Sequence, residues 1–310
     1  MPSKLATATV PAYRDFDATV AAVAVLSPHF VRVTFTGHDL ERFGDTCLDQ
    51  RIKVVLPLRD AGGTDPFADL PRGEDWYAAW RALPRERQNP FRTYTVRAVR
   101  PGRREVDVDF VRHGDGGPAS AWAGRVEVGH RCVLIGPDRR GDSALVGVDW
   151  RPGAATEVLL AGDETAVPAI GSILESLPAD TRGQAFLEVP TAEDVLPLEA
   201  PDGIEVRWLP RVAGMDAAVP PHGARLAQVL RAELTVGPAH PGVADPEPVD
   251  VDGEPLWETP VEEPEGAAFA WLAGEATVIR SLRRHLVRDR GWDRRHVAFM
   301  GYWRLGRAEV

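Results

Sequence analysis

The order of hydrophobic segments along this chain changes near residue 150. Before that point, short stretches with alternating apolar side chains follow one another between Gly- and Pro-containing turns, which is typical of antiparallel strands. After it, short apolar stretches alternate with longer ones of helical spacing, which is typical of a parallel sheet covered by helices. The sequence therefore predicts an antiparallel β-barrel domain over residues 1–150 and an α/β domain over residues 151–310.

The first half carries the expected strands of the barrel. They cover residues 22–37 with a break at Ser27-Pro28, 51–58, 91–99, 104–113 and 130–137. An acidic segment that contains tryptophan, residues 65–88, separates two of these strands and is expected to hold a short helix around Trp76 to Trp80.

The second half carries strands and helices in alternation. Strands are expected at 156–162, 184–190, 204–210, 268–274 and 296–303, and helices at 164–177, 224–234 and 276–290. A stretch rich in Pro, Asp and Glu, residues 236–266, is expected to be a mobile excursion. Because the carboxyl ends of parallel strands meet at one edge of a sheet, a ligand is expected there.

Composition limits the classes of function. The net charge of −10 over 310 residues argues against a nucleic-acid-binding protein, which needs a basic surface. The two cysteines, Cys47 and Cys132, form no C-x-x-C motif, which argues against a zinc ribbon, a thiolate-held iron–sulfur cluster or a disulfide scaffold. Neither a signal peptide nor an apolar run near the ~20 residues of a membrane span is evident. We expect a soluble, cytoplasmic monomer that binds neither nucleic acid nor membrane.

The stretch NPFRTYTVR places a cation near each end of a strand and an aromatic residue between them. An ordinary barrel strand would have aliphatic residues on one face. Tyr94 can pack against a flat ring, and Arg92 and Arg97 can clamp phosphate groups bidentately. The backbone groups of Thr95 and Val96 can bond the edge of such a ring. Taken alone, the stretch fits equally well a surface strand with cross-strand ion pairs.

A glycine-rich turn, HGDGGPASAWA, follows one strand later. Its three glycines permit close approach of the backbone, and Pro118 suits the first turn of a helix. Ala119 and Ser120 would then offer N–H groups at a helix N-terminus, which is a common anion site. An ordinary turn before a helix is the competing interpretation, and no P-loop motif is present.

The stretch LLAGDETAVPAIGSIL is predicted to be a strand that leads into a helix. Asp163, Glu164 and Thr165 would sit at the crossover, where an α/β domain holds its ligand. The competing interpretation is a capped helix, with Asp163 or Thr165 as the cap and Pro168 in the first turn. The G-x-G-x-x-G fingerprint of dinucleotide-binding domains is missing.

The C-terminal stretch FMGYWRLG takes Tyr302 and Trp303 out of the end of the last parallel strand, with Arg304 next. The carboxyl end of this strand points to the expected ligand edge. A tryptophan in this place is as often a core residue as a functional one.

In this order and spacing, the four stretches, with WLAGE at residues 271–275, resemble the siderophore-interacting proteins. These are FAD-containing, NAD(P)H-dependent ferric-siderophore reductases of the ferredoxin-reductase-like superfamily. The resemblance covers most of the chain and implies an N-terminal antiparallel FAD-binding barrel and a C-terminal parallel-sheet NAD(P)H-binding domain. Two inserts, residues 60–88 and 236–266, lengthen the chain beyond compact members.

The resemblance also implies roles for individual residues. Contacts with FAD are expected from Arg92, Tyr94, Thr95, Val96, Arg97, Asp109, Val111, His113, Ala119, Ser120, Trp122, Asp163, Glu164, Thr165 and Trp303. The nicotinamide nucleotide is expected to face Arg211, Gly274 and Glu275. A basic mouth for an anionic ferric chelate is expected from Lys53, Arg139, Arg140 and Arg304.

The implied reaction begins with hydride transfer from NADPH or NADH to FAD. Electrons then pass singly to iron(III) held by a siderophore, and the metal is freed because iron(II) binds hard oxygen ligands more weakly. The flavin carries this chemistry, so no side chain need act as an acid or base, and no permanent metal site is expected. Two alternatives stay open: a flavin reductase that serves another acceptor or a partner protein, and a siderophore-binding protein that keeps flavin only as structure.

Overall fold

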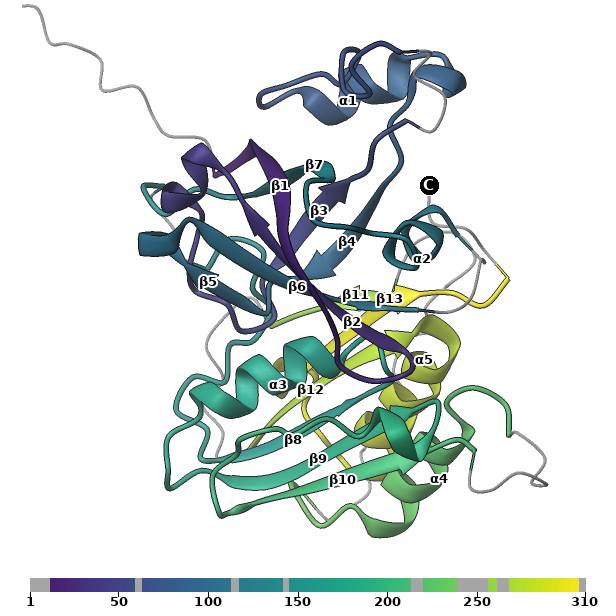
Figure 1. The fold of residues 1–310 in the computed structure, drawn as a ribbon. Coiled ribbons are helices and arrows are strands. Elements are labelled where there is room, and N and C mark those ends of the chain that lie inside the picture. The colour runs from purple at the N-terminus through teal and green to yellow at the C-terminus, as the bar shows by residue number, and fades with distance from the viewer. Residues whose placement is uncertain are drawn as a thin grey trace, which may run out of the picture. The chain divides into compact units, whose positions relative to one another are not determined.

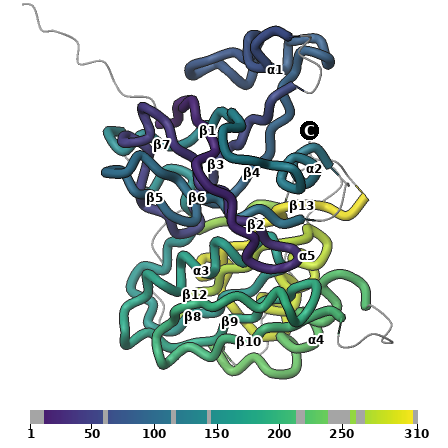
Figure 2. The backbone as a smooth tube through the Cα atoms, viewed as in Figure 1, coloured from purple at the N-terminus to yellow at the C-terminus, as the bar shows by residue number. Residues whose placement is uncertain are grey.

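The computed structural model describes residues 12–58, 63–112, 117–141, 145–212, 220–238, 256–260 and 268–306. The chain divides into two compact units, whose backbone is drawn in Figure 1 and Figure 2. The first unit comprises residues 1–24, 32–110 and 114–147, and the second comprises residues 25–31, 111–113 and 148–310.

Seven strands form one antiparallel sheet in the first half of the chain. They are β1 (Tyr13–Val25), β2 (Phe30–Thr36), β3 (Arg51–Val55), β4 (Phe91–Thr95), β5 (Ala98–Arg100), β6 (Glu105–Val111) and β7 (Arg131–Pro137). Their order in the sheet is β4-β3-β7-β1-β2-β6-β5. β1 begins at Tyr13, earlier than predicted, because its first residues pair with β7 while Asp15 and Asp17 alternate with the buried Phe16 and Ala18.

The two edge strands of this sheet, β4 and β5, belong to one stretch of chain. Between them, the N–H of Val96 donates to the carbonyl of Gln50 at 2.9 Å, and the N–H of Arg97 donates to the carbonyl of Asp107 at 2.9 Å. Residues 91–100 therefore pair first with β3 and then with β6, which joins the two edges. The predicted antiparallel barrel is confirmed, although the expected single strand at 91–99 is split where it passes from one partner to the other.

Two short helices accompany the barrel: α1 (Trp76–Ala82) and α2 (Pro118–Ala123). The prediction of a helix around Trp76 to Trp80 is confirmed. Trp80 is buried, packs against Phe91 of β4 with ring centroids 4.8 Å apart, and donates its indole N–H to the carbonyl of Asn89 at 2.9 Å. The acidic insert is thus held by aromatic side chains.

Six strands form the sheet of the second unit. They are β8 (Glu157–Gly162), β9 (Arg182–Val189), β10 (Ile204–Pro210), β11 (Trp257–Glu258), β12 (Ala268–Glu275) and β13 (Val297–Trp303). Their order is β10-β9-β8-β12-β13-β11, and every neighbouring pair is parallel except β11 with β13. The predicted parallel sheet is confirmed, with one antiparallel edge strand that was not predicted.

Helices cover both faces of this sheet (Figure 1). They are α3 (Val167–Ser176), α4 (Ala224–Glu233) and α5 (Ala276–Arg284), which continues into a π-helical turn at His285–Asp289. The last two share one core with Ala161 of β8. A Cβ on the next residue, Gly162, would lie 2.4 Å from Ala166, so α3 packs on the opposite face. Short 3-10 turns lie at His38–Arg42, Arg85–Arg87, Pro101–Arg103, Ala192–Asp194 and Arg294–His296.

Part of the Pro/acid-rich stretch 236–266 belongs to this fold, which corrects the expectation of a mobile excursion for residues 236–238 and 256–260. Val236 and Leu256 are buried in the core of the second unit. The carbonyl of Leu256 accepts the N–H of Gly301 at 2.7 Å, which aligns β11 along β13. Residues 239–255 and 261–267 lie outside the described part of the chain. None of the described helices has the length and apolar character needed to span a bilayer.

Candidate functional site

The carboxyl edge of the parallel sheet gathers polar and aromatic side chains, because five parallel strands end there. Asp163 and Glu164 follow β8, Glu188 lies near the end of β9, Arg211 follows β10, Glu275 ends β12, Trp303 ends β13, and His222 precedes α4. The sequence analysis had assigned five of these residues to ligand contacts and had missed Glu188 and His222.

Glu164 and Arg211 form a buried, bidentate ion pair. The two guanidinium nitrogens Nη1 and Nη2 of Arg211 donate to Oε2 and Oε1 of Glu164, each at 2.7 Å. Burial alone would raise the pKa of Glu164, but the hydrogen bonds and charges of Arg211 and His222 outweigh it and hold this pKa well below its usual range. Glu164 is therefore a fixed negative charge at neutral pH.

His222 completes this cluster. Its Nε2 lies 3.1 Å from Nη1 of Arg211 and 3.3 Å from Oε1 of Glu164. Burial alone would lower the pKa of His222, but the hydrogen bond with Glu164 and the charges of Asp163 and Glu164 raise it above its ordinary value. Its Nδ1 is buried and has no hydrogen-bond partner among the described residues. The ring stands edge-on to Trp303, with centroids 4.8 Å apart and planes at 89°.

Asp163 accepts four hydrogen bonds. Oδ1 accepts the N–H of Thr165 at 2.9 Å and the hydroxyl of the same residue, whereas Oδ2 accepts the N–H of Glu275 and the indole N–H of Trp303, each at 2.8 Å. Burial and the neighbouring charge of Glu164 raise the pKa of Asp163 to about 6. Asp163 therefore ties the end of β8 to the ends of β12 and β13.

Gly274 makes room for this carboxylate. Its φ is +150°, and a Cβ at this position would lie 2.6 Å from Oδ2 of Asp163. Glu275, the next residue, caps α5 by accepting the N–H groups of Thr277 and Val278 at 2.8 and 3.0 Å. The sequence analysis expected both Gly274 and Glu275 to face the nicotinamide nucleotide, which stays a prediction; in the structure their contacts shape the edge itself.

Glu188 has a similar structural part at the start of α4. It is fully buried, and its two oxygens accept the N–H groups of Gly223 and Leu226 at 2.7 and 2.9 Å. Its Oε1 also lies 3.3 Å from Nη1 of Arg211. The signal in the sequence was an acidic residue within an otherwise apolar strand, because such a residue must find partners inside the fold.

On the barrel, the predicted ligand residues of β4 also serve the sheet. Nη1 of Arg92 donates to the carbonyl of Phe91 at 2.7 Å, and the Tyr94 ring packs 4.3 Å from that of Phe110. The side chain of Thr95 is buried, and Thr95 pairs with Arg51 of β3. The N–H of Val96 is engaged by the barrel closure described above, so it is occupied by Gln50 rather than directed to a ligand.

Asp109 of β6 lies within reach of two arginines, Arg32 of β2 and Arg97. Arg32 donates to both of its oxygens, at 2.7 and 2.8 Å, and Nε of Arg97 lies 3.9 Å away. The sequence analysis identified Asp109 and Arg97 but missed Arg32, which sits on a different strand. Val111 ends β6 and is buried, whereas His113 lies outside the described residues.

The helix α2 begins where the sequence predicted. Gly117 is extended, and the first helical hydrogen bond runs from the N–H of Ala121 to the carbonyl of Gly117 at 2.9 Å. The backbone N–H groups of Ala119 and Ser120 therefore lie before the first N–H group that donates within the helix. Trp122 stacks on Phe35 with planes at 10°, and its indole Nε1 is buried with no hydrogen-bond partner in the described part of the chain.

The four cations of the predicted basic mouth have partners of different kinds. Lys53 donates to the hydroxyl of Thr93, Arg139 lies 3.4 Å from Asp45, and Arg140 donates to both oxygens of Asp138 at 2.9 and 2.6 Å. Arg304 follows β13 at the carboxyl edge of the other unit. The Arg140 charge is already matched by a buried carboxylate, and the role of all four cations in binding an anionic ligand stays a prediction.

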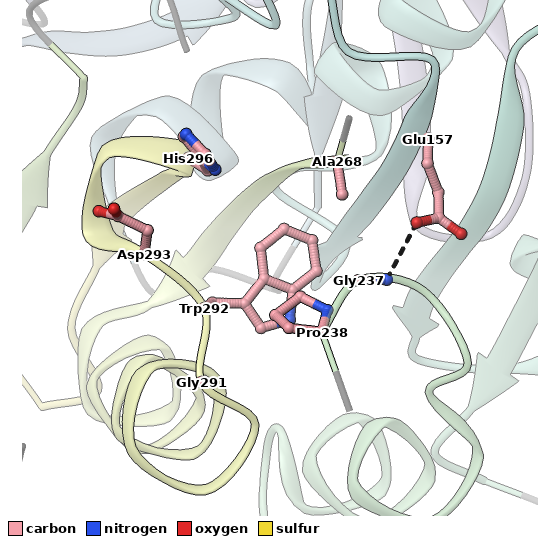
Figure 3. A pocket seen from close by; sticks show the side chains of 8 residues that line it. All are labelled: Glu157, Gly237, Pro238, Ala268, Gly291, Trp292, Asp293 and His296. Carbon is pink, nitrogen blue, oxygen red and sulfur yellow. Dashed lines mark hydrogen bonds between the residues drawn. The ribbon is translucent and has the colours of Figure 1, made fainter. Parts of the chain in front are cut away.

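A cavity of about 360 Å³ lies at the opposite, amino edge of the parallel sheet (Figure 3). Glu157 and Ala268, the first residues of β8 and β12, line it together with the Trp292 ring. Oε2 of Glu157 accepts the N–H of Gly237 there at 3.2 Å. Since strands of this type present ligands at their carboxyl ends, this cavity is not the candidate site.

Comparisons with known proteins agree with this architecture. A family model described as siderophore-interacting FAD-binding domain matches residues 19–141, and one described as siderophore-interacting protein matches residues 155–306. The chain is 34% identical to an uncharacterized protein of Mycobacterium tuberculosis over 94% of this chain and 90% of the relative. It is 30% identical to the ferric vibriobactin reductase ViuB of Vibrio cholerae over 92% of this chain and 87% of the relative.

Solved structures give the same result. A siderophore utilization protein from T. fusca is 28% identical, with a TM-score of 0.69 over 97% of this chain and 96% of that one. The ferredoxin reductase in carbazole 1,9a-dioxygenase is 16% identical and shares the fold alone, with a TM-score of 0.58 over 95% of this chain and 71% of that one. The ferredoxin-reductase-like fold is thus confirmed.

Proposed function

The chain belongs to the siderophore-interacting protein family, and we propose that it is an FAD-dependent reductase that oxidises NAD(P)H and reduces ferric siderophores. The observation that carries this proposal is the charged, buried network of Asp163, Glu164, Arg211 and His222 at the carboxyl edge of a parallel sheet, in a chain whose first half matches an FAD-binding domain. Buried titratable groups with shifted pKa values at such an edge are typical of a functional site.

The residues of the barrel fit FAD. Trp122, in the last turn of α2, offers a buried indole N–H that has no partner among the described residues. Backbone N–H groups at the start of the same helix favour a phosphate. Arg92 and Arg97 supply cations for the diphosphate, and Tyr94 supplies an aromatic face for the ring. When bound, FAD supplies hydride acceptance and single-electron transfer, and the side chains bind and orient it.

At the carboxyl edge, the side chains would receive the nicotinamide nucleotide. Trp303 and His222 present aromatic surfaces to this edge. Beside them, Glu164 and Arg211 form an ion pair in which both groups are charged at neutral pH. Arg211 remains the candidate for a contact with the 2′-phosphate of NADPH, although such a phosphate would compete with Glu164 and Glu188 for the same guanidinium. The ferric siderophore is the substrate, so its iron needs no ligands from the protein.

Anaerobic absorbance spectroscopy tests the proposal. The purified protein should be yellow and release FAD on denaturation, NADPH or NADH should bleach the flavin, and a ferric chelate should then restore its colour. A yellow protein that no nicotinamide nucleotide bleaches would instead support a siderophore-binding protein that keeps flavin only as structure. Bleaching without reoxidation by any ferric chelate would support a flavin reductase with another acceptor.

Flavin occupancy should depend on Arg92. Arg92→Ala removes a half-buried cation from β4 and is expected to lower the FAD content of the purified protein several-fold, because a charged hydrogen bond is worth about 1.5–3 kcal/mol. Arg103→Ala is the control, since this side chain is 73% exposed in a turn and its Nε lies 3.3 Å from Glu105. The ratio of flavin to protein absorbance measures both, and equal occupancy in the two variants would remove Arg92 from the site.

The affinity for an anionic ferric chelate should depend on Lys53. On a protein with net charge −10, attraction must come from local cations, so Lys53→Ala should raise the KM for a ferric catecholate and weaken the dependence of this KM on salt. Arg131→Ala is the control, because Arg131 is another exposed barrel cation and lies 3.1 Å from Asp65. Steady-state reduction at two ionic strengths measures the effect. Identical kinetics in both variants would place the chelate elsewhere.

A further inference from the structure

Trp303 is held from two sides within the second unit. Its indole N–H donates to Oδ2 of Asp163 at 2.8 Å, and its ring lies edge-on to His222 with centroids 4.8 Å apart. These partners come from the end of β8 and from the residues before α4, whereas Trp303 ends β13. The pose of a partly exposed tryptophan is therefore set by two residues far from it in sequence.

Asp163 is itself held by the backbone of its own unit. Two of its donors are backbone N–H groups, those of Thr165 and Glu275, and these fix both carboxylate oxygens. The bare Cα of Gly274 lets the carboxylate approach β12. Each oxygen accepts two donors, so the fold already engages both oxygens of the carboxylate.

We propose that Asp163 is a positioning residue that holds Trp303 in the one pose that admits the nicotinamide nucleotide at the carboxyl edge. The nucleotide part of this inference rests on the proposed function, whereas the link between Asp163 and Trp303 does not. Without the anchor, other staggered rotamers of the indole would compete with the binding-competent one, and the fraction of molecules in that pose would fall.

The kinetic test separates positioning from chemistry. Asp163→Ala removes both acceptor oxygens and should raise the KM for NADPH or NADH about three-fold or more, while kcat for flavin bleaching stays within about two-fold. Trp303→Phe removes the indole N–H and should have a similar effect. The double variant should be no worse than the more affected single variant, because both changes break the same contact. Effects that multiply in the double variant would overturn the proposal.

A second readout needs neither nucleotide nor turnover. Asp163 faces the charges of Glu164 and His222, with Arg211 behind them, and its pKa is raised to about 6 chiefly by burial. Tryptophan fluorescence should therefore show a transition with a midpoint near pH 6, as the acceptor of the Trp303 N–H loses its charge. This transition lies below that of His222, whose pKa is raised above its ordinary value. Trp303→Phe should abolish this transition.

Trp257→Phe is the matched control, because Trp257 is a partly buried tryptophan of the same sheet and stacks on Tyr302. This variant should keep the pH transition. A full transition in Trp303→Phe would overturn the link between the two residues. This comparison does not depend on whether Asp163→Ala folds. If the unmodified protein shows the fluorescence transition but no nicotinamide nucleotide bleaches its flavin, the proposed function is wrong. The role of Trp303 toward the nucleotide is then wrong too, whereas the contact between Asp163 and Trp303 stands.

Discussion

Replacing Arg211 by alanine is expected to lower the free energy of unfolding by about 3–5 kcal/mol, because it leaves two buried carboxylates without their cation. Glu164 is fully buried and bonded to both Nη atoms of Arg211, and Glu188 lies 3.3 Å from one of them. Urea denaturation of the full-length protein, monitored by circular dichroism, measures the loss of unfolding free energy.

Arg207→Ala gives the matched control for Arg211. Arg207 lies on the same strand, β10, and pairs with Glu233 and Glu205, but its side chain is 32% exposed. Exposed pairs contribute about 0–1 kcal/mol, so this variant should unfold nearly as the parent does. Equal losses in the two variants would show that the Arg211 network contributes no more than a surface pair.

Gly274→Ala is expected to destabilise the second unit strongly. The new Cβ would lie 2.6 Å from Oδ2 and 2.8 Å from Cγ of Asp163, at a φ of +150° that L-residues rarely adopt. Strain and overpacking each cost about 1–3 kcal/mol, so a combined loss of about 2–6 kcal/mol in unfolding free energy follows. The Asp163 carboxylate cannot move away without breaking its bonds to Glu275 and Trp303.

Gly102→Ala is the control for Gly274, since no atom lies within 4 Å of its Cβ and its φ is not in the left-handed region. Thermal unfolding of both variants should give a large shift for Gly274 and a small one for Gly102. Fluorescence of Trp303 should also change in Gly274→Ala, because its anchor is displaced. Similar thermal shifts in the two variants would contradict the close approach of Asp163 to β12.

The period of the apolar residues was enough to predict both sheets. Alternation in the first half and strand–helix alternation in the second place most elements within a few residues of their observed bounds. β11 was not predicted, because its two residues lie in a stretch whose Pro and acidic content indicates a loop. The neighbouring Leu256 is buried by tertiary packing, which the local sequence does not indicate. The early start of β1 was not predicted, because charged residues in its first positions obscure the alternation of buried and exposed side chains.

The candidate site was predictable only in part, because motifs report single stretches and the site joins several. Asp163, Glu164 and Trp303 stood out as residues at strand ends. His222 did not, since nothing in the sequence near it indicates that the chain returns to Glu164. Contacts of this kind, between residues 58 positions apart, depend on which strands are neighbours in the sheet.

Residues 91–100, which comprise β4, β5 and the two residues between them, link the two edges of the barrel and carry the candidate flavin-binding arginines, Arg92 and Arg97. A ligand gripped by Arg92 and Arg97 would then also hold together β3 and β6, which lie far apart in the strand order. Occupancy and integrity of the barrel are coupled in that case by mass action, so that a molecule emptied of its ligand loses stability in proportion to the logarithm of ligand concentration over its Kd. In a cell short of flavin, the barrel would thus lose the stability that its ligand supplies and be more readily degraded by proteases.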